Sequence, residues 1–156
     1  MNNMIEKSNI AINEQVRDYE PNSNETIELK HELSLMEQKC YEIPIIIGGK
    51  EHYTNNKKTC VKPHNHQHIL AEYHEAGSIE IQKAIDSSLN AWKSWSKLSL
   101  NERASIFQKA AELLAGPWRN RINAATMLNQ SKNVYQAEID SACELIDFFN
   151  FNAEFA

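Results

Sequence analysis

Apolar residues recur at helical spacing through most of the second half of the chain. A first stripe begins after Ser78, which we predict as a helix N-cap, and consists of Ile81, Ile85, Leu89, Trp92 and Trp95. Ser99 and Glu102 fit the capping box S-x-x-E, and a second stripe follows at Ala104, Phe107, Ala111 and Leu114. The pattern therefore predicts two consecutive helices, both amphipathic.

Gly116-Pro117 interrupts this helical run, because proline is tolerated in the first turn of a helix but not inside one. A further stripe, at Trp118, Ile122, Ala125 and Leu128, predicts the next helix. A polar break at residues 129–133 separates it from a last helix that runs towards Ala156.

The last helix carries apolar residues around most of its circumference. One stripe is formed by Ile139, Cys143, Ile146 and Phe149, and another by Leu145, Phe148, Phe151 and Phe155. A helix of this kind is normally buried on most sides. We therefore expect covering elements that the chain does not itself supply, and we interpret the helix as truncated at Ala156.

The first half of the chain has shorter elements. Residues 1–21 are polar and aperiodic and predict an N-terminal arm, and residues 22–40 predict a surface helix, with Asn22 and Glu25 as its capping pair. Residues 41–76 predict a short antiparallel β region of hairpins, in which Gly48-Gly49 closes the first strand. The helix of residues 22–40 has an apolar stripe on one side only, formed by Leu29, Leu33, Met36 and Cys40, and this pattern predicts a surface position. Residues 77–156 are predicted to form the helical part.

Composition and charge exclude several classes of protein. Hydrophobic residues make up 42% and charged residues 24% of the 156 positions, as in ordinary globular domains, and the net charge is −5. This charge offers no basic footprint for nucleic acid and no polybasic patch for a membrane surface. No apolar run approaches the length of a membrane span. We expect neither partner.

Three cysteines without CxxC spacing, Cys40, Cys60 and Cys143, indicate reduced thiols. No signal or clear transit peptide is seen at the start of the chain. The expected location is cytoplasmic, or the mitochondrial matrix in a eukaryote. Cys143 lies among apolar residues and is predicted to be a buried, inert thiol.

Histidines and acids are the remaining candidates for chemistry. His64, His66 and His68 could converge on a metal ion if they alternated along a strand. Pro63 and Asn65 make the first half of this segment a turn, so we interpret the three histidines as a polar turn and expect no metal site.

Four acids of the last helix are candidates for chemistry: Glu138, Asp140, Glu144 and Asp147. Composition alone favours ordinary surface or paired acids, although Glu144 lies between apolar neighbours, where a carboxylate can also face a polar pocket. Lys132 in the polar break is weak evidence for any role. Gly48-Gly49 is a turn without the spacing of a phosphate loop.

Four segments carry a resemblance to a known family: residues 43–51, 63–76, 103–119 and 123–153. Together they resemble the N-terminal part of the aldehyde dehydrogenase superfamily and, within it, the delta-1-pyrroline-5-carboxylate (L-glutamate gamma-semialdehyde) dehydrogenase family. The resemblance extends from about Asn13 to Ala156. It implies an α/β parent fold in which residues 77–156 belong to the cofactor-binding domain.

The resemblance also implies a function for the parent enzyme. Members of that family use NAD to oxidise L-glutamate gamma-semialdehyde to glutamate in proline breakdown, and the parent is expected to be a homo-oligomer acting on a small-molecule substrate. Glu144 matches a family glutamate near the aldehyde pocket, which implies a substrate-proximal role and disagrees with the surface interpretation above.

The family's catalytic residues and nucleotide-binding region lie beyond the matched segment. We therefore expect no catalytic, cofactor-binding or metal residue here, no NAD binding by this chain, and no activity of the chain alone. The family often has glycine where this chain has Asn129 or Ser131, which puts the tightness of that turn in doubt. Two other hypotheses remain: a non-catalytic module that docks on full-length subunits through Leu145, Phe148 and Phe155, and an unrelated helical scaffold with a histidine metal site.

Overall fold

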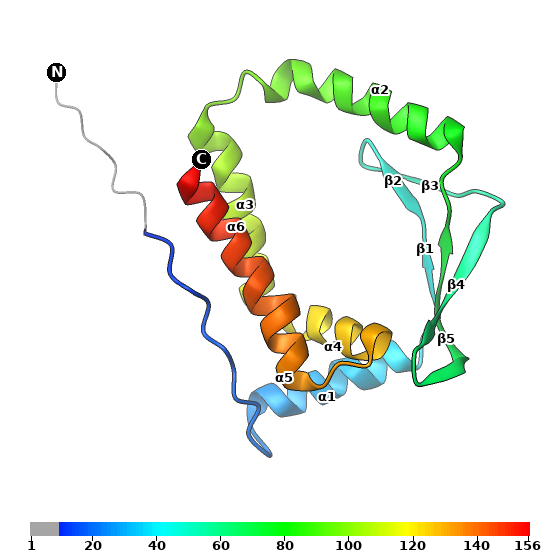
Figure 1. Ribbon diagram of the computed structural model, residues 1–156, viewed down its shortest axis with the longest axis vertical. Helices are drawn as coiled ribbons and strands as arrows, with labels where there is room; N and C mark the ends of the chain where they lie inside the picture. Colours follow the sequence, from blue (N-terminus) through cyan, green and yellow to red (C-terminus); the bar gives the residue numbers. More distant parts are fainter. Residues whose placement is uncertain (1–9) are drawn as a thin grey trace.

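The computed structural model describes residues 10–156, which form an open frame of helices and strands (Figure 1). In chain order the elements are α1 (Asn24–Glu37), β1 (Tyr41–Ile43), β2 (Ile45–Ile47), β3 (Lys50–His52), β4 (Lys57–Lys62), β5 (Asn65–His74), α2 (Ser78–Trp95), α3 (Leu100–Ala115), α4 (Arg119–Gln130), α5 (Val134–Ala137), the π-helical turn η1 (Glu138–Cys143) and α6 (Glu144–Phe155). The pair α3 and α6 forms one side of the frame, and the strands form the opposite side. Helix α2 connects the two sides at the top of the view, and helices α1 and α4 connect them at the bottom.

The strands form two small sheets, and one pairing differs from the sequence prediction. In the three-stranded sheet β1-β5-β4, β1 pairs with β5 in parallel, Tyr41 opposite Ala71, while β4 and β5 are antiparallel. Strands β2 and β3 form a separate hairpin. Pro44 separates β1 from β2 because it has no N–H to donate to a sheet. The expected purely antiparallel region is therefore a mixed one.

Helix starts match the predicted capping at one position and differ at two others. Ser99 and Glu102 form the predicted capping box of α3. The N-cap of α1 is Ser23, whose hydroxyl accepts from the N–H of Thr26, and not Asn22. Helix α2 is capped by Gly77, one residue before the predicted Ser78. These differences of one residue leave the elements themselves unchanged.

The polar break before the last helix is shorter than predicted, because α4 continues to Gln130. Ser131 then adopts a left-handed backbone conformation with φ of 55°, which favours glycine. The last helix is composed of three parts, α5, η1 and α6, because the backbone passes through a π-helical turn between Glu138 and Cys143.

Helix α4 buries a different face from the predicted one. Trp118 is 49% exposed, and the buried positions are Arg119, Asn123, Ala124, Thr126 and Leu128. Three of these five are polar, so an apolar periodicity could not locate this face. The buried apolar core lies where α4, η1 and α6 meet and includes Leu128, Ala137, Ala142 and Ile146.

The frame leaves much apolar surface uncovered. Helix α2 has no buried residue, and its predicted stripe is exposed, with Leu89 at 61% and Trp92 at 64%. The chain exposes 11398 Å², whereas a compact protein of this size exposes about 8,000 Å². Many large apolar side chains of the described residues therefore have no covering element.

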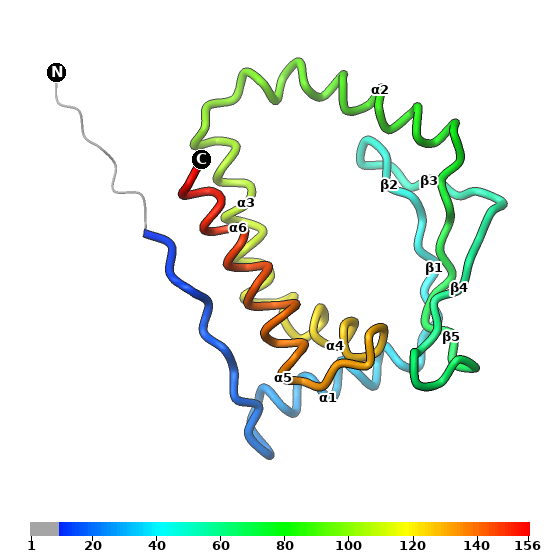
Figure 2. The backbone as a smooth tube through the Cα atoms, viewed as in Figure 1, coloured from blue at the N-terminus to red at the C-terminus, as the bar shows by residue number. Residues whose placement is uncertain are grey.

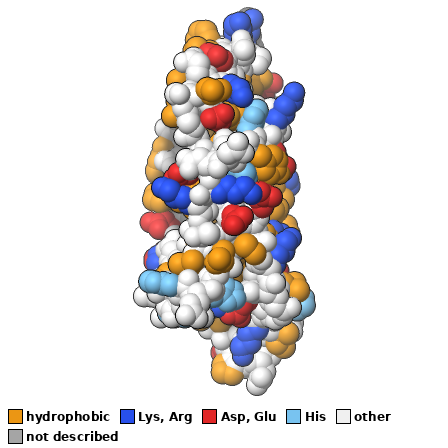
Figure 3. Space-filling view, turned by 90° about the vertical axis from the view of Figure 1, so that its right-hand side faces the viewer, with side chains coloured by type: hydrophobic (Ala, Val, Ile, Leu, Met, Phe, Trp, Pro, Cys, Tyr) orange, Lys and Arg blue, Asp and Glu red, His pale blue; other side chains and the backbone are white. Residues whose placement is uncertain are grey.

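Figure 3 shows the strand side of the molecule, where acidic and basic side chains are interspersed. Lys58 pairs with Glu75 at 2.8 Å, and Lys57 contacts both Glu42 and Glu72. Among residues 10–156, none of the helices has the length and apolar character that crossing a membrane requires.

Candidate functional site

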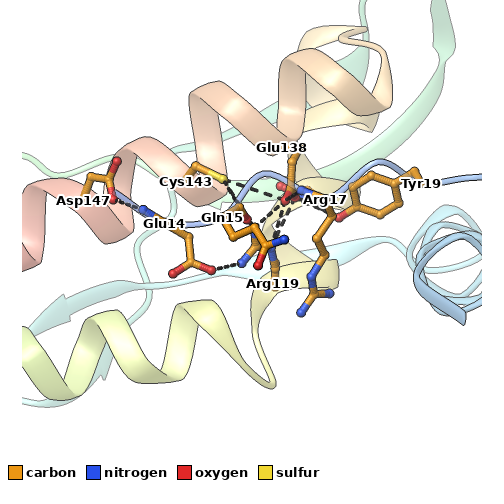
Figure 4. Close-up of polar contacts among 9 residues, drawn as sticks. Glu14, Gln15, Arg17, Tyr19, Arg119, Glu138, Cys143 and Asp147 are labelled. Atoms are coloured by element: carbon orange, nitrogen blue, oxygen red, sulfur yellow. Dashed lines mark hydrogen bonds and ion pairs between the residues drawn. The ribbon is translucent and has the colours of Figure 1, made fainter. Parts of the chain in front are cut away.

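A buried ion pair lies where α4, η1 and the N-terminal segment meet (Figure 4). Arg119 follows the Gly116-Pro117 turn and opens α4, and Glu138 opens η1; their side chains are 1% and 0% exposed. The Nε of Arg119 donates to both carboxylate oxygens of Glu138, at 3.1 and 3.3 Å, and its Nη2 donates to Oε1 as well. A guanidinium and a carboxylate held in this way form a strong charge-assisted pair.

Three further donors complete the hydrogen bonding of Glu138. The Nδ2 of Asn123 lies 2.7 Å away, the hydroxyl of Tyr19 2.8 Å away, and the backbone N–H of Arg17 2.9 Å away. Arg119 in turn donates to the carbonyl of Gln15 at 2.7 Å and to the carboxylate of Glu14. Because both charges are fully partnered, their burial is tolerated.

The pKa values in this cluster reflect the pairing. Burial raises the pKa of Glu138, but the hydrogen bonds from Arg119, Arg17 N–H, Tyr19 and Asn123 outweigh it, so the pKa is lowered from its ordinary value. Burial lowers the pKa of Arg119, and its hydrogen bonds to Glu138 and Glu14 more than reverse this. Burial and the hydrogen bond to Glu138 raise the pKa of Tyr19 to about 12.

Cys143 lies beside the same ion pair and is 5% exposed. Burial, together with the charge of Glu138, raises the pKa of its thiol to about 11. The predicted burial of this thiol is confirmed. Its raised pKa supports the prediction that it is inert, since a reactive cysteine needs a lowered pKa.

The N-terminal arm, residues 10–20, runs beside α6 as an extended segment (Figure 2). Its backbone N–H groups donate to acids of the last helix: Arg17 to Glu138 at 2.9 Å, Glu14 to Asp147 at 2.6 Å, and Ala11 to Glu154 at 2.5 Å. The three donors are spaced three residues apart, and the same three positions are partly buried while those between them are exposed. The arm is therefore held by a regular series of backbone contacts, in addition to the side-chain contacts of Asn13, Glu14 and Tyr19.

Glu144 lines an open groove of about 540 Å³ between this arm and α6. It occupies the first turn of α6 directly after η1, and its side chain is exposed. Asn13, Glu14 and Val16 of the arm form one wall of the groove, and Asp147 lies on the other. π-helical turns are frequent at functional sites. The substrate-proximal role of Glu144 stays a prediction.

The other candidates have structural partners. His64 lies in the turn before β5, and its Nδ1 is 2.7 Å from the hydroxyl of Ser131. Lys132 pairs with Asp140 at 2.8 Å. In residues 10–156, the structure shows no cluster of three or more potential metal ligands, and His64, His66 and His68 belong to a turn and to the start of β5.

The sequence analysis did not identify the Arg119–Glu138 pair. A signal was present, because Arg119, Asn123 and Thr126 occur at helical spacing and so share one face of α4. It also missed His74, which is 7% exposed and whose imidazole lies 3.1 Å from Glu42 and 2.8 Å from Thr54.

Comparison with known protein families matches residues 51–156, more than half of the chain, to the aldehyde dehydrogenase family. The chain belongs to this family. The predicted aldehyde dehydrogenase-like α/β fold is thereby confirmed, and the hypothesis of an unrelated helical scaffold is wrong.

Several curated relatives are delta-1-pyrroline-5-carboxylate dehydrogenases. The zebrafish (Danio rerio) and human mitochondrial enzymes of that name are each 42% identical to this chain over 144 residues. The matched part is 92% of this chain and 26% of each relative. The chain thus spans about a quarter of the length of these relatives.

Solved structures agree with the sequence comparison. The delta-pyrroline-5-carboxylate dehydrogenase of Mycobacterium tuberculosis, in a crystal structure with bound NAD and cobalamin, matches with a TM-score of 0.91 and 43% identity, covering 94% of this chain and 28% of that one. A Thermus thermophilus 1-pyrroline-5-carboxylate dehydrogenase matches at 0.84 with 22% identity, which supports the fold.

The described residues do not fit an NAD-binding site of their own. A pyrophosphate usually sits at a glycine-rich turn that opens a helix. Here the turn at Gly48 and Gly49 joins β2 to β3, two strands. A Cβ atom at Gly48 would lie 2.9 Å from the hydroxyl of Ser87, so α2 already occupies the space beside this turn.

Proposed function

We propose that this chain is the N-terminal part of an NAD-dependent dehydrogenase that oxidises L-glutamate gamma-semialdehyde, in equilibrium with 1-pyrroline-5-carboxylate, to L-glutamate in proline catabolism. The observation that carries this proposal is 42% identity over 92% of the chain to enzymes of that name. The uncovered faces of α2 and α6 support it, because they are the surfaces on which the remaining parts of such a subunit would pack.

Under this proposal we expect the chain alone to have no dehydrogenase activity. Oxidation of an aldehyde through a covalent intermediate needs an activated nucleophile. Of the three cysteines, Cys143 is buried with a raised pKa, Cys40 is exposed, and Cys60 contacts the side-chain oxygen of Asn129. Cys143 lies beside Glu138, but this carboxylate is already paired with Arg119 and the raised pKa of the thiol disfavours the thiolate. NAD would be bound by the rest of the subunit.

Within the complete subunit we place Glu144 at the aldehyde pocket. Its exposed side chain lines the groove between the arm and α6, directly after the π-helical turn, where it could contact a polar substrate. The three free thiols and the names of the eukaryotic relatives support a reducing compartment, the mitochondrial matrix in a eukaryote. We expect the complete enzyme to be a homo-oligomer.

A chimera tests this function. Residues 10–156 replace the matching part of the Mycobacterium tuberculosis enzyme, and NADH formation is followed with the semialdehyde as substrate. We expect turnover by the chimera and none by the chain alone. A folded, NAD-binding chimera without turnover would refute the proposal, and steady turnover by the chain alone would refute its inactivity.

Glu144→Gln in the chimera tests the assigned role of that residue. Loss of the charge next to the substrate should lower kcat/KM about tenfold or more, a loss of at least ~1.4 kcal/mol of transition-state stabilisation. Glu112→Gln, at an exposed acid of α3, is the matched control and should leave kcat/KM unchanged. Equal kinetics of the two variants would remove Glu144 from the site.

A second candidate function is a non-catalytic module that docks on full-length subunits. Phe148 is 54% and Phe155 76% exposed, and together with the partly buried Leu145 they offer an apolar face for docking. Co-purification of the chain with an intact subunit would support docking. A monodisperse monomer that binds no dye for apolar surface would exclude it.

A further inference from the structure

A second groove, of about 610 Å³, lies on the side of α6 that faces α3. The end of α2, the first two turns of α3 and the second half of α6 line it, mainly with apolar side chains: Trp95, Leu100, Phe107, Phe148 and Phe149. The rings of Phe107 and Phe149 meet at 5.9 Å and form its floor. Size and lining are those of a binding groove.

One charged side chain, Arg103, lines this groove. Its Nε atom is buried and has no hydrogen-bond acceptor among the described residues. A buried donor without an acceptor is costly, and such a group in a native protein needs an explanation. The explanation that fits an apolar groove is an acceptor supplied by whatever fills the groove.

Acids on the neighbouring elements already have other partners. Glu102 accepts from the backbone N–H and the hydroxyl of Ser99, at 2.7 and 2.8 Å. Glu112 pairs with Lys109, and Asp147 and Glu154 hold the arm on the other side of α6. Across residues 10–156, no ion pair joins Arg103 to any carboxylate, that of the chain terminus at Ala156 included.

We propose that this groove is the docking site of an amphipathic helix that presents one carboxylate to Arg103 among apolar side chains. The charge complementarity selects the partner: an apolar groove with a single guanidinium favours an apolar surface with a single acid, and guanidinium binds carboxylate through two parallel hydrogen bonds. Two packed helices that leave a groove between them accept a third helix.

The helix belongs to the remaining part of the aldehyde dehydrogenase subunit, so this inference rests on the proposed function. The matched relatives are about four times as long as the segment that this chain covers. Arg103 then serves as a specificity determinant of subunit assembly, because a carboxylate at the correct position both accepts from its Nε and neutralises its charge.

Probe peptides test the proposal with the full chain. The probe is a helical peptide of about 18 residues with one leucine face and a central glutamate, and its counterparts carry glutamine or lysine at that position. We expect the glutamate peptide to bind at least ~10-fold more tightly than the glutamine peptide. Calorimetry measures both affinities, and the fluorescence of Trp95 reports whether the groove is occupied.

Substitutions of Arg103 test whether its charge causes the preference for the glutamate peptide. R103Q should remove the preference for glutamate, and R103E should transfer it to the lysine peptide. R121Q changes an exposed arginine outside the groove and should leave the preference intact. Circular dichroism verifies that each variant is folded, and R103K, which retains the charge, should keep part of the preference.

Absence of peptide binding, or equal binding of the three peptides to the wild-type chain, overturns the proposal. These outcomes need no enzymatic activity, so they are distinguishable from a failure of the proposed function. Glutamate-selective peptide binding together with a chimera that shows no turnover would support the docking site and refute the proposed reaction. Turnover by the chimera without selective peptide binding would support the reaction and refute the docking site.

Discussion

Two arginines near helix starts, Arg119 on α4 and Arg103 on α3, differ in whether the chain supplies their hydrogen-bond acceptors. Arg119, on α4, is 1% exposed and donates to Glu138, Glu14 and the carbonyl of Gln15. Arg103, on α3, has a buried Nε without an acceptor among the described residues. The region around α4 and η1 is thus self-sufficient, whereas the region between α3 and α6 is built for a partner.

Of the substitutions that test this difference, Arg119→Met should lower the free energy of unfolding most. It leaves the carboxylate of Glu138 buried without its cation, and we expect the free energy of unfolding to fall by about 3–5 kcal/mol. Arg103→Met is the matched control and should cost less than about 1 kcal/mol, because it removes an unpaired charge. Urea denaturation measures both. Similar losses would show that the two arginines are not different in kind.

Two positions on α6 extend the comparison to apolar side chains. Ile146→Ala, at a side chain that is 1% exposed, should destabilise the chain by about 2–4 kcal/mol through the cavity that it leaves. Phe148→Asp, at a side chain that is 54% exposed, should cost less than about 1 kcal/mol here. In the chimera the same Phe148→Asp should cost several kcal/mol. Mild effects in both proteins would show that α6 is not covered in the complete subunit.

Acidification should weaken the paired region in a predictable direction. The pKa of Glu138 is lower in the folded chain than its ordinary value, so its contribution to stability is present above about pH 4, the unfolded value, and is lost as pH falls through the folded pKa. Unfolding free energies of the wild type and Glu138→Gln, measured against pH, should therefore differ most near neutral pH. If the difference in unfolding free energy between the two proteins grew on acidification, the pKa of Glu138 would be raised in the folded chain and our assignment would be wrong.

Thiol reactivity gives the smallest effect and leaves the fold unchanged. With a pKa raised to about 11 and 5% exposure, Cys143 should react with a thiol reagent at pH 8 far more slowly than the exposed Cys40. Mass spectrometry of alkylated peptides measures each rate. Arg119→Met removes a charge that lowers the pKa of Cys143, so in the folded chain it should slow this reaction further, whereas Arg103→Met should leave it unchanged.

Local patterns predicted the helices well because the apolar stripes of α2, α3 and α6 follow the helical period and Ser99 caps α3 as expected. The parallel pairing of β1 with β5 could not be predicted, because it joins residues 30 positions apart and depends on Pro44 ending β1. The contacts of Glu138 were missed for the same reason, since Tyr19 lies 119 residues away. The substrate-proximal role of Glu144 stays a prediction that rests on the family resemblance, because no local pattern distinguishes this acid from its neighbours.

The arm bound along α6 has a consequence for which sequences the family can accept there. Because the acids of α6 and η1 hold the N–H groups of Ala11, Glu14 and Arg17, these three contacts do not depend on the side chains. Glu14 is constrained a second time, because its carboxylate accepts from Arg119. Proline, which has no N–H, is the residue that each of these three positions must avoid. Substitution in the arm is therefore limited by the loss of a backbone donor at three positions and by the loss of a charge at one of them.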